Sequence, residues 1–464
     1  MRVLLIEPPF QRFMGYRRFY FPISLCYLAG YLNAKGYYVR VYDSEFNENA
    51  KSMTRDEQIA AYDKYIEGLK NEDNDVWEEL RNVIIKQNPD VVGISIISNK
   101  LQSAYMTARI CKDANPRIKT VVGGPHPTAL PEQVLMHEEI DFVVRGEGEA
   151  TFHELLEALK GGIGFERVDG ISFREKERII HNKSREFIKD IDSLPYEFRK
   201  LIIGYERYAP RDMGMIIGSR GCPYNCYFCA SKTMWQRRVR YRSLNNIIEE
   251  VKYLMKEFNT THFIFEDDNF DIPKQRIIDF CKMLNGQGIK ITWEIQARVN
   301  SIDKEICELL KESGCVDIAV GIETGSEKML KHINKQASLD DARRAARAMN
   351  ETGMPWKAFI VIGFPEEAKE DIYETIRFVE EIKPKFTSLH IFTPFPGTEF
   401  FSLYNIPEDE FCMYEPQSPH NCFSKHIDKK EFPLIVKDVI KRVNKLNEEN
   451  RILFEKSNVW GVDR

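Results

Sequence analysis

Short apolar runs alternate with longer amphipathic stretches along the first 160 residues of the chain. Five runs are rich in Val, Ile and Leu and are each followed by a polar or glycine-containing segment: residues 2–7, 38–42, 90–97, 120–122 and 142–144. Runs of this length and composition predict buried strands, and the stretches between them have helical patterns. This alternation predicts an α/β fold with a doubly wound parallel sheet, in which ligands bind beyond the carboxyl ends of the strands.

A second series of strand and helix patterns begins at Met215. Its six apolar runs are residues 215–218, 262–265, 291–297, 317–322, 359–362 and 386–392. Polar or glycine-rich residues follow each run, which places candidate site residues at the carboxyl ends of the predicted strands. Residues 171–174 and 178–181 predict a small hairpin before this series, and residues 430–453 predict an amphipathic helix after it.

These patterns divide the chain into four predicted parts. They are a Rossmann-like domain at 1–160, a connector at 161–214, a barrel-like domain at 215–398 and a small helical region at 399–464. The net charge of −5 gives no general sign of a nucleic-acid partner. No apolar stretch approaches the ~20 residues that cross a membrane, and the first residues do not form a secretory signal. Ten cysteines, three of them clustered, fit a reducing cytoplasm better than a disulfide scaffold.

Three cysteines, Cys222, Cys226 and Cys229, lie in one short loop after the first run of the second series. Their Cys-x3-Cys-x2-Cys spacing can fold three thiolates around one inorganic core, and the next cysteine, Cys281, lies far along the chain. A [4Fe–4S] cluster usually takes four thiolates, so three would leave one iron open to another ligand. The competing interpretations are a structural zinc site, which normally closes with four ligands, and three unrelated buried cysteines.

The loop from Gly221 to Cys229 resembles the cluster motif of the radical S-adenosylmethionine (radical SAM) enzymes. The resemblance implies a partial (β/α)6 barrel in which the open iron binds SAM and an electron from the cluster cleaves SAM to a 5′-deoxyadenosyl radical. Segments of the N-terminal half resemble the cobalamin-binding domain that precedes this barrel in one large subfamily, the class B methyltransferase-like enzymes. The matching segments are 22–29, 92–95, 123–128 and 146–149. The implied cofactors are therefore a [4Fe–4S] cluster, S-adenosyl-L-methionine and cobalamin.

The cobalamin contacts that this resemblance implies lie in the loops after the predicted strands: Ser95, Ser98, Gly123, Gly124, His126, Gly146, Glu147 and Glu149. The dinucleotide fingerprint Gly-x-Gly-x-x-Gly is absent after the first strand, which argues against a nicotinamide cofactor, whereas a flavin stays compatible with the fold. The Asp-x-His-x-x-Gly motif, whose His ligates cobalt in cobalamin mutases, is absent as well. His126 is the candidate substitute ligand, and loop shaping or contact with the nucleotide tail of cobalamin are its alternative roles.

The polar groups of bound SAM each need a partner at the barrel strand ends. Glu266 and Asp267 follow the second strand, where the family's SAM-amine segment lies, although helix-capping acids would give the same pattern. Arg298 follows the third strand and suits the SAM carboxylate, or alternatively a structural ion pair.

The nucleoside of SAM is expected at the later strands. Glu323, in the segment Gly-Ile-Glu-Thr-Gly-Ser that ends at Ser326, resembles the family's ribose contact, and Ser326 is included in the predicted site. Phe228, just before the third cysteine, and the strand end at Gly363 match the family's adenine segments. A role in the core is the alternative for that strand.

This resemblance implies methyl transfer from methylcobalamin to a substrate radical, most often at an unactivated carbon and less often at phosphorus. A cobalamin-bearing oxidative cyclase or rearranging enzyme is the nearest alternative, and a cobalamin carrier or sensor with a degenerate barrel is a third. The sequence has no additional N-terminal set of cysteines for a second cluster, which argues against a methylthiotransferase. The implied partners are a small-molecule, lipid or peptide substrate and an electron donor such as flavodoxin or ferredoxin.

Two further groups of residues have less specific patterns. The basic stretch Arg237–Arg242 predicts either a solvated face or a contact for an anionic substrate or electron donor. Cys412, His420, Cys422 and His426 are residue types that bind metals, but their spacing is a weak signal for a second metal site.

Overall fold

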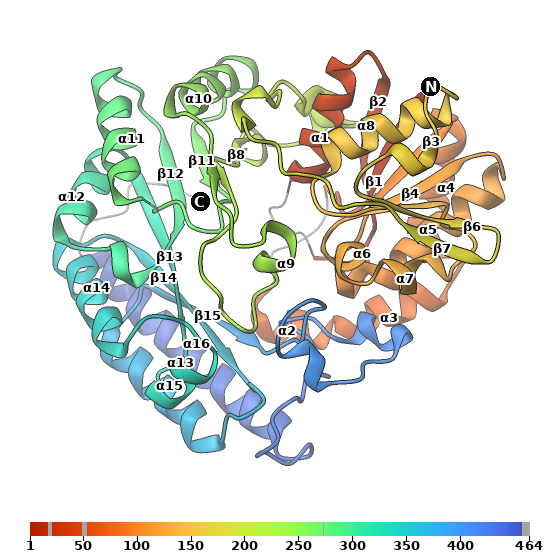
Figure 1. The fold of residues 1–464 in the computed structure, drawn as a ribbon. Coiled ribbons are helices and arrows are strands. Elements are labelled where there is room, and N and C mark those ends of the chain that lie inside the picture. Colours follow the sequence, from red (N-terminus) through yellow and green to blue (C-terminus); the bar gives the residue numbers. More distant parts are fainter. Residues whose placement is uncertain (17–20, 49–52, 272, 457–464) are drawn as a thin grey trace. The chain divides into compact units, whose positions relative to one another are not determined.

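The computed structural model describes residues 1–16, 21–48, 53–271 and 273–456. The chain forms two compact units, each with its own large sheet (Figure 1). The N-terminal unit comprises residues 1–212, 233–236 and 395–415, and the barrel unit comprises residues 213–232, 237–394 and 416–464. Two expectations reach beyond the described residues: 49–52 of the helical pattern at 44–88, and the end of the region at 399–464.

The N-terminal unit contains a seven-stranded sheet of order β2-β1-β3-β4-β5-β6-β7. Its strands are β1 (Arg2–Glu7), β2 (Tyr38–Asp43), β3 (Val91–Ser95), β4 (Lys119–Gly123), β5 (Phe142–Val144), β6 (Ile171–Glu175) and β7 (Arg178–His181). The first five strands pair in parallel, which confirms the predicted doubly wound sheet. The predicted hairpin forms β6 and β7, and it extends this sheet because β6 pairs antiparallel with β5.

Helices pack on both faces of this sheet (Figure 1). They are α1 (Ile23–Ala34), α2 (Arg55–Ala60), α3 (Tyr62–Lys70), α4 (Asp75–Gln87), α5 (Leu101–Ala114), α6 (Pro125–Ala129), α7 (Pro131–Leu135) and α8 (Gly148–Leu159). Trp77 and Leu80 of α4 are fully buried in the core cluster. The Trp77 indole N–H donates to Gly68 O at 3.0 Å, so this large side chain is buried without an unpaired donor.

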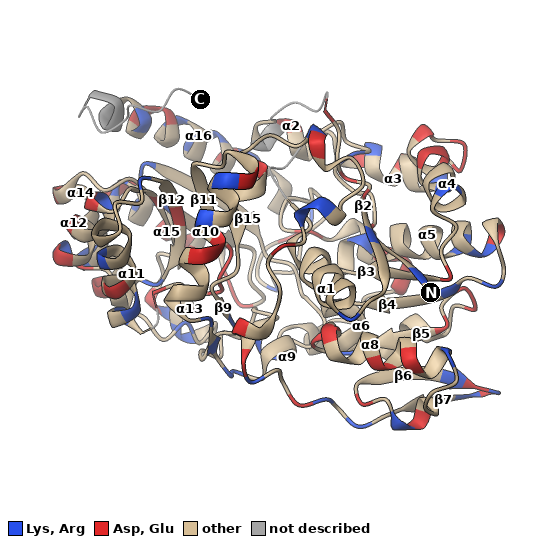
Figure 2. Ribbon diagram, turned by 90° about the horizontal axis from the view of Figure 1, so that it is seen from above, with Lys and Arg blue, Asp and Glu red and all other residues tan. Residues whose placement is uncertain are grey.

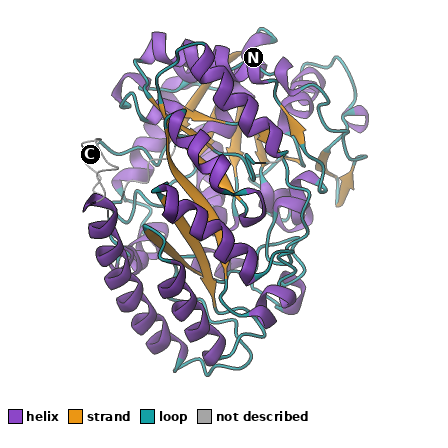
Figure 3. Cartoon of the chain, turned by 90° about the vertical axis from the view of Figure 1, so that its left-hand side faces the viewer, coloured by secondary structure: helices purple, strands orange, loops and turns teal. Residues whose placement is uncertain are grey.

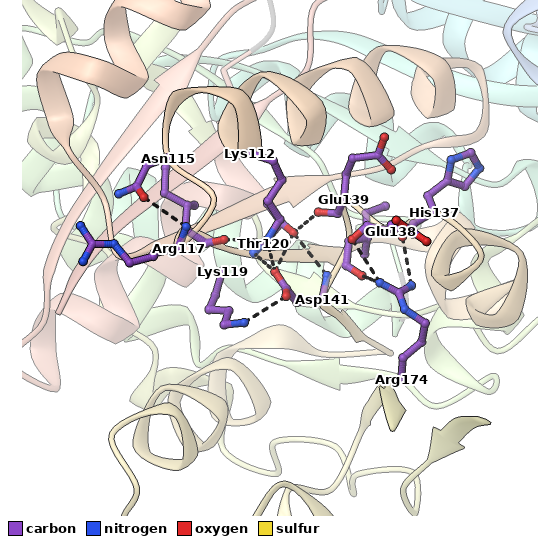
Figure 4. A network of polar contacts seen from close by, with 12 residues as sticks. Lys112, Asn115, Arg117, Lys119, Thr120, His137, Glu138, Glu139, Asp141 and Arg174 are labelled. Atoms are coloured by element: carbon purple, nitrogen blue, oxygen red, sulfur yellow. Dashed lines mark hydrogen bonds and ion pairs between the residues drawn. The ribbon is translucent and has the colours of Figure 1, made fainter. Parts of the chain in front are cut away.

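The amino edge of this sheet is held by a network of charged side chains (Figure 4). Asp141 accepts from Lys112 Nζ at 2.5 Å and from the Thr120 N–H at 2.8 Å. The Arg174 guanidinium donates to four backbone carbonyls, among them Ile140 O at 2.7 Å and His137 O at 3.0 Å. These contacts tie β6 to the segment before β5 and leave the opposite, carboxyl edge of the sheet to the glycine-rich loops.

The barrel unit contains six parallel strands in the order β15-β14-β13-β12-β11-β8. They are β8 (Met215–Ile216), β11 (His262–Phe265), β12 (Thr292–Ala297), β13 (Cys315–Glu323), β14 (Trp356–Ile362) and β15 (Phe386–Ile391). A two-stranded ladder of β9 (Ser219–Arg220) and β10 (Arg240–Tyr241) follows β8. All six predicted strands are present in chain order, and this confirms the predicted partial barrel.

Helices cover the outer face of the barrel sheet (Figures 1 and 3). They are α10 (Leu244–Phe258), α11 (Lys274–Gly286), α12 (Lys304–Glu312), α13 (Glu327–His332), α14 (Leu339–Thr352), α15 (Lys369–Ile382) and α16 (Phe432–Lys456), with the short α9 (Ser231–Trp235) before β10. Local chemistry sets their ends: Ser338 Oγ accepts from the Asp341 N–H at 3.1 Å, and Gly353 ends α14 with φ of 61°.

The last helix, α16, lies along the edge strand β15. The Asn447 side chain accepts from the Thr387 N–H at 2.7 Å and donates to Thr387 O at 3.0 Å. Asn450 donates to Pro384 O at 2.8 Å, just before the strand. The polar backbone groups of an edge strand need partners, and α16 supplies them here.

Acidic and basic residues are interspersed along the outer helices of both units (Figure 2). No helix in the described part of the chain is long and apolar enough to cross a membrane.

Candidate functional site

The cysteine loop follows β8 and β9 at the carboxyl edge of the barrel sheet. Cys226 is buried, and Cys222 and Cys229 are half-buried. Burial raises the pKa of the Cys222 thiol and raises that of Cys229 to about 12, and in both cases the neighbouring Cys226 thiol contributes to the rise. The three thiols therefore lie near enough to one another to interact electrostatically.

Two nitrogen donors face these thiols. Asn269, after β11, donates to Cys222 Sγ at 3.0 Å, and Arg298 Nη1, after β12, donates to Cys226 Sγ at 3.9 Å. Donors of this kind stabilise thiolates and tune the potential of iron–sulfur clusters. Among the described residues, no group of three or more His, Cys, Asp or Glu side chains converges on a single ion position. In a [4Fe–4S] cluster each thiolate binds a different iron, so the three thiols need not converge on one ion position.

Arg298 is the best-positioned cation of the predicted site. Its side chain is about 5% exposed, its guanidinium lies 3.6 Å from the centroid of the Tyr224 ring, and Nη2 donates to Lys335 O. Its backbone N–H donates to Asp271 Oδ2 at 2.9 Å. The buried Arg298 Nε has no hydrogen-bond partner among the described residues, and neither has Asp271 Oδ1. Unpaired buried donors are costly, so this nitrogen fits an anionic ligand such as a carboxylate.

Glu323 ends β13 in an unusual backbone conformation. Its φ is 65°, in the left-handed region that residues with a side chain rarely adopt, and the pairing of β13 with β14 shifts register at this point. The buried Glu323 carboxylate accepts from Lys335 Nζ at 2.5 Å. Backbone strain at a strand end is typical of functional positions. Sequence reasoning missed Lys335, because no periodic pattern links it to Glu323.

The two acids after β11 have different surroundings. Asp267 is buried, and it accepts from the Gly218 N–H at 2.6 Å and from Ser219 Oγ at 2.8 Å. Burial raises the pKa of Asp267 to about 6, although these hydrogen bonds oppose the shift. Glu266 is exposed, and its backbone N–H donates to Ile216 O at 2.9 Å. Asp267 therefore joins β11 to the segment before the cysteine loop, while the Glu266 side chain is accessible.

An aromatic pair lies beside the third cysteine. The rings of Phe228 and Phe364 are 5.6 Å apart in an edge-to-face arrangement. Gly363 has φ of 86°, and a Cβ at this position would lie 2.7 Å from the Phe432 ring. Ser326 Oγ donates to Asp371 Oδ1 at 2.8 Å, which ties the end of the Glu323 segment to α15. The two predicted adenine segments are thus neighbours.

In the N-terminal unit, His126 is buried and joins two loops at the carboxyl edge. Its Nδ1 is 3.0 Å from Ser98 Oγ, and its Nε2 is 2.9 Å from Gln133 Oε1. Burial lowers the pKa of His126 to about 4, so its ring is neutral at pH 7. Gly124 has φ of 112°, and a Cβ there would lie 2.7 Å from Ile96 O, so only glycine lets these loops approach. Both nitrogens of His126 are occupied, which favours a loop-shaping role.

The remaining predicted cobalamin contacts line the same edge. Ser95 and Gly123 are paired in register at the ends of β3 and β4. Gly146 has φ of 72°, and its N–H donates to Thr128 Oγ1 at 3.0 Å. The buried Glu147 accepts from the Ile188 N–H at 2.8 Å, and Glu149 is buried in the first turn of α8.

A buried charge cluster at this edge was not predicted. Lys100 Nζ lies 2.5 Å from Glu7 Oε1 and 2.7 Å from Glu45 Oε1. Asp43 accepts from Tyr208 Oη at 2.6 Å. Burial raises the pKa of Asp43 to about 7, and the two glutamates add to the rise. The cluster ties the ends of β1 and β2 to the loop after β3. The sequence feature that could have indicated this cluster is an acidic residue at the end of each of the first two strands, Glu7 and Asp43.

The two less specific groups receive structural roles. Arg242, in the basic stretch, is buried and forms an ion pair with Glu250 at 2.6 Å, while Arg237 is exposed and donates to Pro223 O at 3.2 Å. Cys412 Sγ donates to Asp409 O at 3.2 Å, and His426 Nε2 lies 2.9 Å from Glu366 Oε2. Only the exposed part of the basic stretch fits the predicted solvated face.

Two family models match this chain. A model of the radical SAM superfamily matches residues 216–379, and a model of the B12 binding domain matches residues 17–156. A Pyrococcus horikoshii protein described as an uncharacterized methyltransferase is 31% identical over 408 residues, which cover 86% of this chain and 82% of that protein. The anaerobic magnesium-protoporphyrin IX monomethyl ester cyclase of Rubrivivax gelatinosus is 28% identical and covers 82% of this chain, with 65% of the cyclase matched.

A solved structure shares the fold over most of the chain. The radical S-adenosylmethionine methyltransferase from Kitasatospora setae, with tryptophan and an SAM analogue bound, has a TM-score of 0.68 at 17% identity. The match covers 86% of this chain and 74% of that structure.

Proposed function

We propose that this chain, which belongs to the radical SAM enzymes that carry a B12-binding domain, methylates an unactivated carbon atom of its substrate. The relative from Pyrococcus horikoshii and the two family models establish the membership. They confirm the resemblance drawn from the cysteine loop, the α/β fold class and the cofactor set of a [4Fe–4S] cluster, SAM and cobalamin. The observation that carries the proposal is the cysteine loop beside the unpaired Arg298 Nε at the barrel's carboxyl edge.

When bound, the cluster and SAM supply a 5′-deoxyadenosyl radical, and cobalamin supplies the methyl group. The chain binds and orients these groups. Cys222, Cys226 and Cys229 hold three irons, and Asn269 and Arg298 donate hydrogen bonds to two of the thiolates. These donors balance part of the negative charge that three thiolates bring to a partly buried loop.

The proposed SAM site uses the polar groups that the barrel strands place at this edge. Arg298 binds the SAM carboxylate through Nε, which has no partner among the described residues. Glu266 accepts from the SAM ammonium. Asp267 holds the Gly218–Ser219 segment in place through two hydrogen bonds. Glu323 accepts from the ribose, and Ser326 fixes the Glu323 segment to α15. Phe228 and the strand end at Gly363 contact the adenine.

The proposed cobalamin site is the carboxyl edge of the N-terminal sheet. Glycines at 123, 124 and 146 let the backbone approach the cofactor, and two of them have positive φ. His126 shapes the loops through Ser98 and Gln133 and does not ligate cobalt, since both of its nitrogens are hydrogen-bonded. Ser95, Glu147 and Glu149 complete the edge.

The domain boundaries at 160, 214 and 398 remain part of this proposal.

The second candidate is an oxidative cyclase of the same family, which the match to the Rubrivivax gelatinosus cyclase supports. Product mass separates the two reactions, because methylation adds one CH2 and oxidative cyclisation removes hydrogen atoms. A carrier or sensor with a degenerate barrel would make no 5′-deoxyadenosine.

The test begins with anaerobic purification of the chain with cobalamin, followed by assays of iron, sulfide and corrin. The proposal expects bound cluster and cobalamin, and reductant-dependent formation of 5′-deoxyadenosine from SAM. Candidate small-molecule, lipid and peptide substrates are then screened for a gain of one CH2 from methyl-labelled SAM. A cluster-loaded protein that never cleaves SAM would contradict the enzymatic proposal.

The proposed electron donor is a flavodoxin or ferredoxin of the cytoplasm. A low-potential donor is needed because the cluster must be reduced before SAM is cleaved. The exposed Arg237, which contacts the cysteine loop at Pro223, supports an acidic protein as this donor. Reduction of the cluster by purified flavodoxin, measured against ionic strength, tests this choice.

A further inference from the structure

Lys335 forms a buried ion pair at the proposed SAM site. The side chain is about 8% exposed, and its ammonium lies 2.5 Å from Glu323 Oε1, whose side chain is about 10% exposed. Breaking a buried pair by removing one partner is strongly unfavourable, because the other charge is left without compensation. Lys335 therefore fixes the direction of the Glu323 side chain.

The short segment 333–336, between α13 and α14, is fastened to the cysteine loop. The Tyr227 N–H donates to Ile333 O at 3.0 Å, and Asn334 Nδ2 donates to Asn225 O at 2.8 Å. Asn334 and Gln336 have φ of 53° and 56°, so Lys335 lies between two residues in the left-handed conformation. Such strain persists only where the surrounding contacts impose it. These contacts hold the Lys335 backbone at a fixed place beside the loop.

The main chain of Lys335 also orients the neighbouring cation. Lys335 O accepts from Arg298 Nη2, while Arg298 Nη1 faces Cys226 Sγ at 3.9 Å. With these two nitrogens engaged, the unpaired Nε is the one left for a ligand. One residue thus contacts both side chains that the proposed function assigns to opposite ends of SAM.

The ion pair lies directly over the strand at Gly321. A Cβ at this position would be 2.4 Å from Glu323 Oε1 and 2.7 Å from Lys335 Nζ. Glycine therefore leaves the space that the pair occupies. Within the described residues, Lys335 is the sole hydrogen-bond partner of the Glu323 carboxylate, which leaves Oε2 able to accept from a ligand hydroxyl.

We propose that Lys335 is a positioning residue for SAM, an inference that rests on the proposed function. Its ammonium holds Glu323 Oε1 and leaves Oε2 to accept from the ribose diol. Its carbonyl keeps Arg298 in the orientation that presents Nε to the SAM carboxylate. Lys335 itself does not touch the reacting atoms.

The experiment compares Lys335→Met, Lys335→Arg and the control Lys357→Met in the full chain, reconstituted anaerobically with iron and sulfide. Lys357 pairs with Asp317 at 3.2 Å, at the start of β14 and far along β13 from Glu323. The readouts are iron content, the dissociation constant of SAM, and the change that SAM causes in the electron paramagnetic resonance spectrum of the reduced cluster.

Lys335→Met is expected to keep its iron and its SAM-free spectrum and to bind SAM about 10- to 100-fold more weakly, the range of outer-shell substitutions. Lys335→Arg should recover a large part of the affinity, because it keeps the positive charge. Lys357→Met should bind SAM within about twofold of the wild type, because its partner Asp317 lies near the opposite end of β13 from Glu323. An unchanged SAM affinity in Lys335→Met would overturn this role alone.

A double-mutant cycle tests whether Lys335 acts through Glu323. Glu323→Gln is combined with Lys335→Met, and the double variant should bind SAM no more than about threefold more weakly than the weaker single variant. If the losses of SAM affinity in the two single variants multiply in the double variant, the proposal is overturned.

Gly321→Ala provides an independent variant, because it displaces the ion pair and keeps both charges. It should also weaken SAM binding and retain iron. Loss of iron in both Gly321→Ala and Lys335→Met would assign the pair to folding of the loop and overturn the proposal. Absence of SAM binding by the wild-type protein would overturn the proposed function together with this role.

Discussion

The carboxyl edges of the two sheets differ in how far their polar groups are satisfied. In the N-terminal unit, His126 has a partner on each ring nitrogen, and Glu147 accepts from the Ile188 N–H. In the barrel unit, the buried Arg298 Nε and Asp271 Oδ1 have no partner among the described residues, and Glu323 is held in a strained conformation. Within the described part of the chain, the N-terminal edge has one unpaired buried donor as well, Arg145 Nε after β5. The two edges therefore differ in degree: the first offers mainly backbone and shape to a ligand, whereas the second offers an unpaired donor and an unpaired acceptor close to the cysteine loop.

This difference fits the chemistry of the two proposed ligands. Cobalamin is large and offers much surface, so close backbone approach at glycines can bind it. SAM is small and carries its charges on the methionine part and two hydroxyls on the ribose, so its binding depends on a few directed contacts. Substitutions at the barrel edge should therefore change ligand affinity, and substitutions at the N-terminal edge should mainly change stability.

The largest expected effect follows removal of a cluster ligand. Cys226→Ala should abolish iron binding and 5′-deoxyadenosine formation, because the remaining two thiolates cannot hold the cluster. Iron and sulfide assays and chromatography of SAM products measure the two effects. Cys281→Ala, a buried cysteine of α11, is the control and should keep its iron. Retention of a full cluster by Cys226→Ala would contradict the assignment.

Arg298→Met should weaken SAM binding by about 30-fold, or roughly 2 kcal/mol, the value of a charge-assisted hydrogen bond. Equilibrium dialysis under anaerobic conditions measures the dissociation constant. Cobalamin affinity should stay unchanged, which would sharpen the contrast between the edges. Arg343→Met, which removes the half-exposed pair between Arg343 of α14 and Glu381 of α15, is the matched control. Equal weakening by both variants would refute a specific role for Arg298.

Asp43 should make the stability of the N-terminal unit depend on pH. Its folded pKa of about 7 lies above the ordinary value near 3.8, because burial disfavours the carboxylate. The native state therefore binds this proton more tightly than the unfolded state does. The contribution of Asp43 to the free energy of unfolding is greatest below pH 4 and is lost as the pH rises through 7. Asp43→Asn should remove this loss, on the order of 2 kcal/mol between pH 5 and 8.

Urea denaturation at several pH values measures this effect. The carboxyl groups of Glu7 and Glu45 and the ammonium of Lys100 face the same cluster, so the slope is compared between wild type and variant. A parallel pH dependence in both proteins would show that Asp43 does not titrate in this range.

His126→Ala should give the smallest functional effect. Loss of the two buried hydrogen bonds should cost about 1–3 kcal/mol of stability. The electron paramagnetic resonance spectrum of bound cob(II)alamin should not change, since both ring nitrogens of His126 already have protein partners. Disappearance of a nitrogen splitting in the variant would show instead that His126 binds cobalt and that the two edges are more alike than proposed.

The fold was largely readable from the sequence because both series of strands are short, apolar and followed by polar or glycine-rich residues. The cysteine spacing likewise predicts the cluster loop, since three thiols at that spacing have few other uses. The predicted strand at 317–322 is longer at both ends in the structure, Cys315–Glu323, and a register shift between Gly321 and Glu323 keeps Glu323 in the ladder with β14. A register shift of this kind has no sequence pattern.

Other parts of the site could not be predicted from periodicity. Lys335 and Asn269 reach their partners across several elements, and only the folded chain brings Lys335 to Glu323 or Asn269 to Cys222. For the basic stretch at 237–242, the sequence pattern did not reveal which residue has a structural role. Arg242 belongs to it in sequence but is buried in an ion pair with Glu250, so residue type alone did not separate a structural cation from an exposed one.

The side-chain amide of Asn447 has a consequence for the behaviour of truncated forms. By pairing with both backbone groups of Thr387, it takes the place that a neighbouring strand would otherwise occupy beside β15. A chain that ends before α16 would present this strand as a template for another molecule, and such templates promote self-association. Shortened versions made for crystallisation should therefore keep α16 through Asn450 to remain monodisperse.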